Sequence, residues 1–130
     1  MTTVIYGSSK PYIGNRPWAD VVLNPASGGG ATLKCLADTG ADYLQVNQAD
    51  ALAAGLSGPL ASGTAAGTLT AGGSTLSLLL VTGVVVDIEA VRVTVDLLVD
   101  PTNSTAPPIA GRQVLLRAFD VGFDKKQWHY

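Results

Sequence analysis

The chain contains one short motif with a clear chemical use, an acidic residue followed by Thr and Gly at Asp38-Thr39-Gly40. The apolar segment before it, Ala31 to Ala37, is typical of a β-strand, so the carboxylate is expected at a strand end. Glycine lets the backbone turn tightly there, and the Thr hydroxyl can hydrogen-bond to brace the turn. Two such carboxylates side by side share one proton, because both cannot ionise cheaply. The motif predicts one half of a dyad that activates water.

The sequence holds only one Asp-Thr-Gly and no Asp-Ser-Gly. A dyad therefore needs a second copy of the chain, and twofold symmetry would bring Asp38 against Asp38 of the partner subunit. The tripeptide alone is a weak signal, since an ordinary Asp-containing turn has the same composition. The interpretation depends on what surrounds it.

The surrounding residues resemble the retropepsin family of aspartic proteases. Lys34 to Asp42 reads Lys-Cys-Leu-Ala-Asp-Thr-Gly-Ala-Asp, which is similar to the first signature of that family. About seventy residues further on, Pro-Ile-Ala-Gly-Arg at Pro108 to Arg112 is similar to the second signature, in which two apolar residues and Gly precede Arg and a short helix. A glycine-rich segment lies between them, where retropepsins carry their flap. The resemblance covers roughly Trp18 to Phe119.

This resemblance implies a role for each residue of the first signature. Asp38 would be the catalytic carboxylate, Thr39 would brace the turn across the dimer, and Gly40 would complete the catalytic turn. Ala41 shapes the turn beside the substrate, and Asp42 would bind the substrate backbone.

The resemblance also implies that Asp42 pairs with Arg112. The pairing is physically reasonable, because a planar guanidinium suits a carboxylate and a partly buried charge needs a partner. Two solvated surface charges are the alternative.

A flap is expected over about residues 60–73, as a glycine-rich hairpin with a mobile tip near Gly63 to Gly67. Gly63, Thr64 and Ala65 would then contact the substrate. A plain flexible loop is the competing interpretation of this segment.

Short runs rich in Val and Thr, separated by Gly, Pro, Asn and Ser, indicate a mostly β protein. A helix is expected after Asn47, over Gln48 to Gly55, and a second over Gly111 to Ala118. The segments expected to form strands are 4–6, 18–23, 31–37, 75–87, 89–99 and part of 119–130.

These elements predict an all-β fold. The resemblance makes it a closed or partly open retropepsin-like β-barrel with one or two short helices, one domain over 1–130, and a symmetric homodimer. An inserted helix after the Asp-Thr-Gly turn is a feature of the cellular and bacterial members, and the sequence places Gln48 to Gly55 there.

The composition argues against several other kinds of functional site. A formal net charge of −2 offers no basic surface for nucleic acid. His129 is the only histidine and Cys35 the only cysteine, so neither a metal site nor a histidine-assisted nucleophile is expected, and no cofactor. No targeting segment or membrane span is visible, which favours a cytoplasmic protein without membrane partners.

The expected function is therefore a dimeric aspartic endopeptidase acting on a peptide or protein substrate. Two alternatives remain open: a noncatalytic peptide-binding or assembly module on the same fold, and a protease that processes only its own precursor. Trp128 near the end of the chain is a candidate interface anchor, with a buried final strand as the equal alternative.

Overall fold

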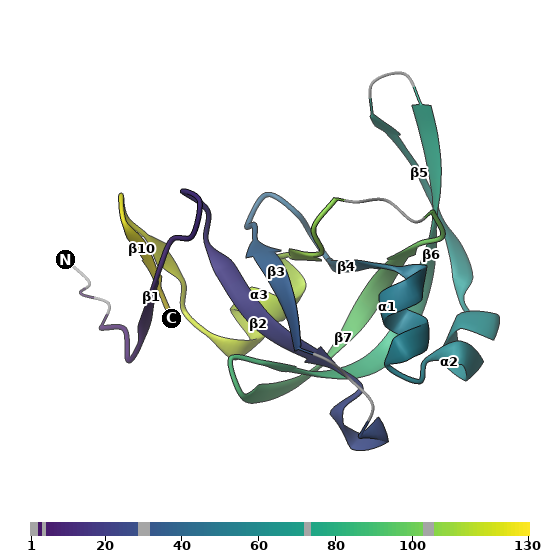
Figure 1. The fold of residues 1–130 in the computed structure, drawn as a ribbon, viewed down its shortest axis with the longest axis horizontal. Coiled ribbons are helices and arrows are strands. Elements are labelled where there is room, and N and C mark those ends of the chain that lie inside the picture. The colour runs from purple at the N-terminus through teal and green to yellow at the C-terminus, as the bar shows by residue number, and fades with distance from the viewer. Residues whose placement is uncertain (1–2, 4, 29–31, 72–73, 103–105) are drawn as a thin grey trace.

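The structure, a computed structural model, describes residue 3 and residues 5–28, 32–71, 74–102 and 106–130, with backbone alone over 66–71 and 74–77. Figure 1 shows strands wrapped into a barrel, a long hairpin rising from it, and small helices on its outside. Along the chain the elements are β1 (Ser9–Pro11), β2 (Trp18–Leu23), the 3₁₀ helix η1 (Pro25–Ser27), β3 (Thr32–Ala37), β4 (Leu44–Asn47), α1 (Gln48–Ala53), α2 (Ser57–Ala61), β5 (Thr64–Ala71), β6 (Ser74–Ile88), β7 (Val91–Asp100), β8 (Ile109–Ala110), α3 (Arg112–Ala118), β9 (Gly122–Phe123) and β10 (Gln127–His129).

The barrel closes through six of the described strands, in the order β2-β3-β8-β4-β7-β6 and back to β2. The closing pair is antiparallel and matches Val21 with Ile88 and Leu23 with Val86. Closure leaves none of these six strands with a long open edge, which protects them from pairing with other chains. The sequence-based expectation of a mostly β protein with a barrel and few helices is confirmed at this level.

Alternating side chains build the barrel core. In β2 buried and partly exposed residues alternate along the whole strand, and the same alternation runs through the second half of β7. This is the period-two pattern of strands with one face inward. After Trp128, the largest fully buried side chains are aliphatic: Leu23, Leu44, Ile88, Leu97 and Leu115.

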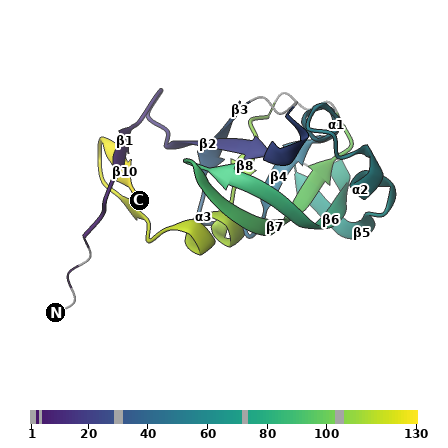
Figure 2. The ribbon, with the colours of Figure 1, turned by 90° about the horizontal axis from the view of Figure 1, so that it is seen from below.

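A second, smaller sheet has the order β1-β10-β9, so strands from the two ends of the chain pair with each other. Figure 2 shows this sheet beside one end of the barrel. Trp128 on its central strand is 0% exposed, and its indole N–H donates to the backbone oxygen of Trp18 at 3.2 Å. The tail was expected to add one strand, but it adds two.

Helices α1 and α3 lie where the sequence predicts them, and Gly55 takes the left-handed conformation expected after α1 (φ 78°). The helix α2 was not predicted, because Ser-Gly-Pro is typical of a turn. Pro59 fits within the first turn of α2, where its missing N–H is not needed.

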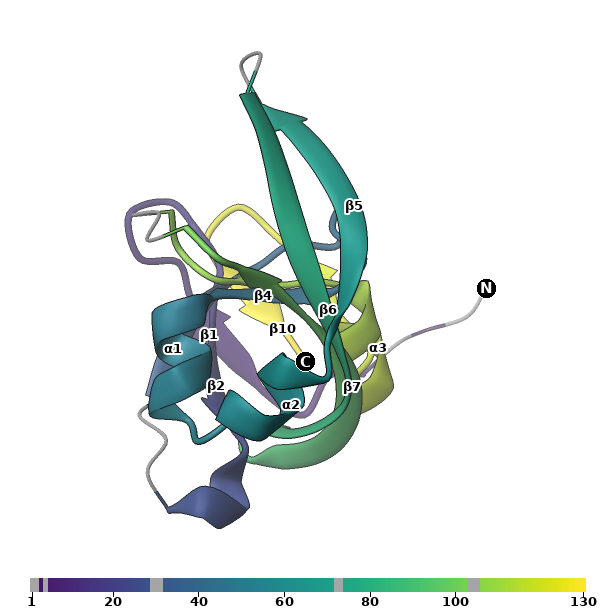
Figure 3. The same ribbon diagram turned by 90° about the vertical axis from the view of Figure 1, so that its right-hand side faces the viewer.

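Two expected positions are wrong. The first strand begins at Ser9; Ile5 and Tyr6 are not in a strand, and Val4 lies outside the described residues. The turn expected near Gly63 to Gly67 is also misplaced, because β5 runs through it from Thr64 to Ala71 and pairs with β6 as far as Ala71 with Ser74. Residues 72–73, between the paired Ala71 and Ser74, lie outside the described residues. Figure 3 shows the hairpin projecting well beyond the barrel.

Candidate active site

The two sequence signatures meet at neighbouring strand ends. Strand β8 lies between β3 and β4, parallel to β3 and antiparallel to β4. Ala37, the last residue of β3, lies beside Ala110, and Ala110 also lies beside Leu44 at the start of β4. The loop that contains Asp38 therefore connects β3 to β4, the two strands that flank β8 of the second signature.

Backbone hydrogen bonds fix the Asp38 turn. The N–H of Asp38 donates to the backbone oxygen of Ala110 at 3.0 Å, and the N–H of Ala41 donates to the backbone oxygen of Asp38 at 3.2 Å. The Asp38 carboxylate accepts the N–H of Gly40 at 2.8 Å through Oδ1. Asp38 is half-buried, while Thr39 and Gly40 are exposed. The turn thus orients one carboxylate oxygen and leaves the group accessible, as a reactive carboxylate requires.

The start of α3 holds the residues that follow this turn. Three consecutive N–H groups donate to three consecutive backbone oxygens: Gly111 to Tyr43 at 3.1 Å, Arg112 to Ala41 at 2.8 Å and Gln113 to Asp42 at 2.8 Å. The first N–H groups of a helix have no partner within the helix, so they are available for such contacts. The chain after Asp38 is thereby fixed to the second signature.

Gly111 has no room for a side chain. A Cβ there would lie 2.7 Å from the backbone oxygen of Ala41 and 2.8 Å from the backbone N of Tyr43. The glycine of the second signature is therefore explained by close packing of two backbones. The sequence suggested this glycine only through the resemblance, and the involvement of Tyr43 and Gln113 was missed, because backbone contacts leave no mark in residue type.

Arg112 forms an ion pair with Asp42, between Nη2 and Oδ1. The side chains are 54% and 64% exposed, so the pair is not the partly buried one that the sequence argument assumed. An exposed pair contributes little to stability. The ion pair nevertheless adds a side-chain contact between α3 and the Asp38 turn, next to the backbone hydrogen bond from Arg112 to Ala41.

Gly63, Thr64 and Ala65 lie at the base of the hairpin. The N–H of Gly63 donates to the backbone oxygen of Leu60 at 3.2 Å, and Thr64 and Ala65 pair with Leu80 and Leu79. Their described contacts join them to α2 and β6, and do not bring them to Asp38. In Figure 1 the hairpin itself rises on the side of the barrel where β3 connects to β4.

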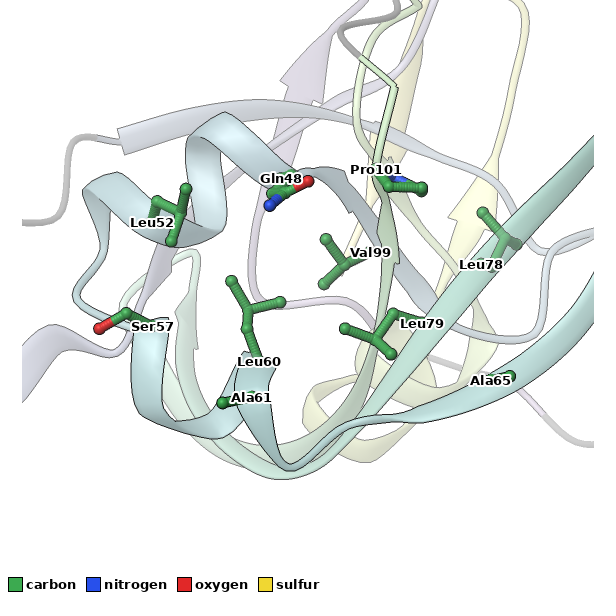
Figure 4. A pocket seen from close by; sticks show the side chains of 10 residues that line it. All are labelled: Gln48, Leu52, Ser57, Leu60, Ala61, Ala65, Leu78, Leu79, Val99 and Pro101. Atoms are coloured by element: carbon green, nitrogen blue, oxygen red, sulfur yellow. The ribbon is translucent and has the colours of Figure 1, made fainter.

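Sequence reasoning missed an apolar pocket of about 530 Å³ beside α1 and α2, shown in Figure 4. Its walls come from five elements and from the residue after β7, so no local pattern could reveal it. Asp38 is not part of this pocket. The lining residues are Gln48, Leu52, Ser57, Leu60, Ala61, Ala65, Leu78, Leu79, Val99 and Pro101.

The sequence also singled out Cys35 and His129. Cys35 is buried, and burial, followed by the charges of Asp50 and Asp20, raises the pKa of its thiol to about 12. His129 pairs with Asp124 at 2.9 Å. The N–H of Lys126, and then His129, lower the pKa of the Asp124 carboxyl to about 2.

Over the residues that the structure describes, no group of three or more His, Cys, Asp or Glu side chains could hold a metal ion. No helix in that part of the chain has the length and apolar character to cross a membrane. Comparison with protein-family models finds no matching family, and comparison with curated proteins finds no matching relative.

Proposed function

We propose that the chain is one half of an aspartic endopeptidase, in which Asp38 of two subunits forms the catalytic dyad. One observation carries the proposal most directly: an accessible Asp-Thr-Gly turn at a strand end, fixed to a Gly-Arg helix start by three consecutive backbone hydrogen bonds. An ordinary surface turn needs no such support from a segment seventy residues away. The glycine without space for a side chain and the Arg112–Asp42 pair belong to the same arrangement.

In the proposed reaction the ionised carboxylate of the dyad takes a proton from water, and the water oxygen attacks the carbonyl carbon of the scissile peptide bond. The protonated carboxyl of the other subunit donates a hydrogen bond to the carbonyl oxygen and then transfers its proton to it. The tetrahedral intermediate then collapses: one of its hydroxyl groups returns a proton to the carboxylate that had lost one, the C–N bond breaks, and the departing amine takes the proton of the other carboxyl. The dyad again holds one proton. The N–H of Gly40 keeps Asp38 oriented throughout through its bond to Oδ1.

The proposed substrate is an extended peptide lying between the Asp38 turns and the two β5–β6 hairpins. An extended peptide can pair with strand edges through its backbone, which makes recognition largely independent of side chains. Ala41 and Asp42 lie directly after the catalytic turn and would contact it there. Gly63, Thr64 and Ala65, at the hairpin base, would reach only a peptide that extends beyond the centre of the site.

The test is cleavage of a denatured protein mixture between pH 4 and 8 by the wild-type chain and its Asp38→Asn variant. We expect cleavage by the wild type, inhibition by a pepstatin-like inhibitor, and a loss of at least about a thousandfold in the variant, because a neutral amide cannot activate water. Asp120→Asn, at an exposed position outside the site, is the matched control and should retain activity.

Two outcomes would contradict the proposal, and a third would restrict it to self-processing. Equal cleavage by wild type and Asp38→Asn would show that another group, or a contaminant, performs the reaction. Peptide binding without cleavage by a folded dimer at every pH would favour the noncatalytic module, and cleavage confined to a longer precursor of this chain would favour self-processing.

A further inference from the structure

The apolar pocket beside α1 and α2 is lined by side chains without any ionisable group. Four of them are leucines, one from α1, one from α2 and two from β6, as Figure 4 shows: Leu52, Leu60, Leu78 and Leu79. Leu52 is one of the large apolar side chains that remain open to solvent, and it is 47% exposed. Pockets of a few hundred cubic ångströms with an apolar lining and few polar groups are typical of small-molecule sites.

The side chains that line the pocket determine which charge and polarity a bound ligand can have. A charged group would lose its hydration without finding an opposite charge, so the occupant has to be neutral inside the pocket. The polar side chains available are those of Gln48 and Ser57, both exposed, which can serve one hydroxyl or amide of a ligand. The lining thus fits a neutral, largely aliphatic molecule with one such polar group.

The pocket also lies at the point where the hairpin leaves the barrel. Strand β6 pairs with β7 from Leu79 onwards, whereas its residues 74–77 pair only with β5. The pairing of β5 with β6 changes register between Ala65 and Thr68. We call the part beyond this irregularity, residues 68–71 and 74–77, the arm. Because no third strand among the described residues pairs with it, the arm depends on its base for its orientation.

We propose that this pocket binds a neutral, largely aliphatic molecule, and that the bound molecule restrains the arm. The pocket wall includes Ala65 on β5 and Leu78 and Leu79 on β6, so an occupant touches both strands at the base of the arm. It touches α1 and α2 as well, and therefore connects a two-stranded segment to the rigid body of the protein. An effect on peptide cleavage rests on the proposed function; binding itself does not.

Binding can be measured on the Asp38→Asn variant, which avoids self-cleavage. The neutral dye Nile red is titrated by fluorescence, and 1-octanol and octanoate are then compared as competitors. We expect saturable dye binding, with 1-octanol displacing the dye at a concentration at least about tenfold lower than octanoate, a difference of about 1.4 kcal/mol. Hydrogen exchange of backbone amides in the arm should slow when 1-octanol is bound.

Ala61→Trp should fill the pocket, because Ala61 is an exposed residue of its wall at the end of α2. We expect at least about tenfold weaker dye binding in this variant. Ala49→Trp, at an exposed position of α1 outside the lining, is the matched control and should bind as the parent does. Both variants should keep the parent's circular dichroism spectrum.

Absence of saturable binding to the folded chain, or equal binding by the two tryptophan variants, would overturn the inference. Unchanged exchange of the arm amides at saturation would overturn the coupling to the arm. These failures can be told apart from a failure of the proposed function. If the protein cleaves peptides but binds no octanol, the dyad is supported and the pocket proposal fails. If it binds octanol but never cleaves peptides, the pocket proposal is supported and the dyad fails.

Discussion

At Gly111 the packing of the backbone leaves no space for any side chain, so only glycine fits this position. A methyl group there would press against backbone atoms of Ala41 and Tyr43, which cannot rotate away as a side chain could. We therefore expect Gly111→Ala to lower the free energy of unfolding by about 1–3 kcal/mol, the usual cost of overpacking. Urea denaturation of the purified variant measures this directly.

Gly58 provides the matched control for that substitution. It lies in α2 with open space around the position of a Cβ, so Gly58→Ala should leave stability unchanged or raise it by up to about 1 kcal/mol through helix propensity. If Gly111→Ala were as stable as Gly58→Ala, the close approach of the two backbones would not constrain the fold.

Cys35 gives the protein a pH dependence of known sign. Burial raises the pKa of its thiol from 9.0 to about 12, so the folded chain keeps the proton while the unfolded chain loses it above pH 9. The free energy of unfolding should consequently fall between about pH 9 and pH 12, by at most about 1.4 kcal/mol per pH unit from this group. Below pH 9 the thiol should have no effect.

The contribution of Cys35 is isolated by comparing urea unfolding of wild type and Cys35→Ala from pH 7 to 11. Other groups titrate in that range in both proteins, so the difference between the two curves reports the thiol. We expect this difference to shrink as the pH rises above 9. A difference independent of pH would show that the thiol is accessible to water in the folded state.

At the scale of elements, Trp128 is the largest buried side chain between the small sheet β1-β10-β9 and the barrel, where Lys10 of β1 also pairs with Asp20 and Glu89. Trp128 is 0% exposed and contacts Tyr130 with ring centroids 4.7 Å apart. We expect Trp128→Ala to lower the free energy of unfolding by about 3–5 kcal/mol, because the cavity would be large. Phe123→Ala, on the neighbouring strand but 44% exposed, should cost under about 1.5 kcal/mol.

Urea denaturation followed by far-ultraviolet circular dichroism tests both variants. Equal stability of Trp128→Ala and Phe123→Ala would mean that the small sheet is not part of the cooperative fold. Trp128 is fully buried within a single chain, which favours the interpretation of a buried strand over that of an interface anchor.

At the scale of the whole molecule, the proposed dyad requires two chains, and this can be tested by mixing. When equal amounts of wild-type and Asp38→Asn chains exchange freely, half of the wild-type chains enter mixed dimers. If mixed dimers are inactive, as a shared dyad requires, the activity of the wild-type chains should fall to about half, and further with excess variant. Activity that is unaffected by the variant would indicate that one chain suffices.

Much of the fold could be predicted from local pattern. The alternation of Val93 and Val95 with polar residues, the Asn47 and Gly55 signals around α1, and the helix after Gly111 depend on residues close in sequence. So does the position of Asp38 at the end of a strand, because an apolar run and a turn motif meet there. Predictions of this kind succeed where local preference and tertiary structure agree.

Local pattern failed where backbone pairing between distant segments decides the outcome. The hairpin expected over 60–73 is present, but its tip was expected near Gly63 to Gly67, where pairing with β6 instead makes Thr64 to Ala71 a strand. Ser9 to Pro11 has no strand signal of its own and becomes β1 only because the C-terminal strand lies beside it. Strand formation depends on the partner strand more than on intrinsic preference.

The sequence by itself therefore determined the chemistry that is available: one Asp-Thr-Gly carboxylate, a single cysteine, a mostly β chain and few charges. Only the tertiary structure decided that the residues after Asp38 bond to the start of α3, that Gly111 has no space for a side chain, and that α1, α2 and the hairpin enclose an apolar pocket. The reason is physical. Residue type sets which interactions are possible, whereas hydrogen bonds and cavities between segments seventy residues apart exist only once the chain has closed into its barrel.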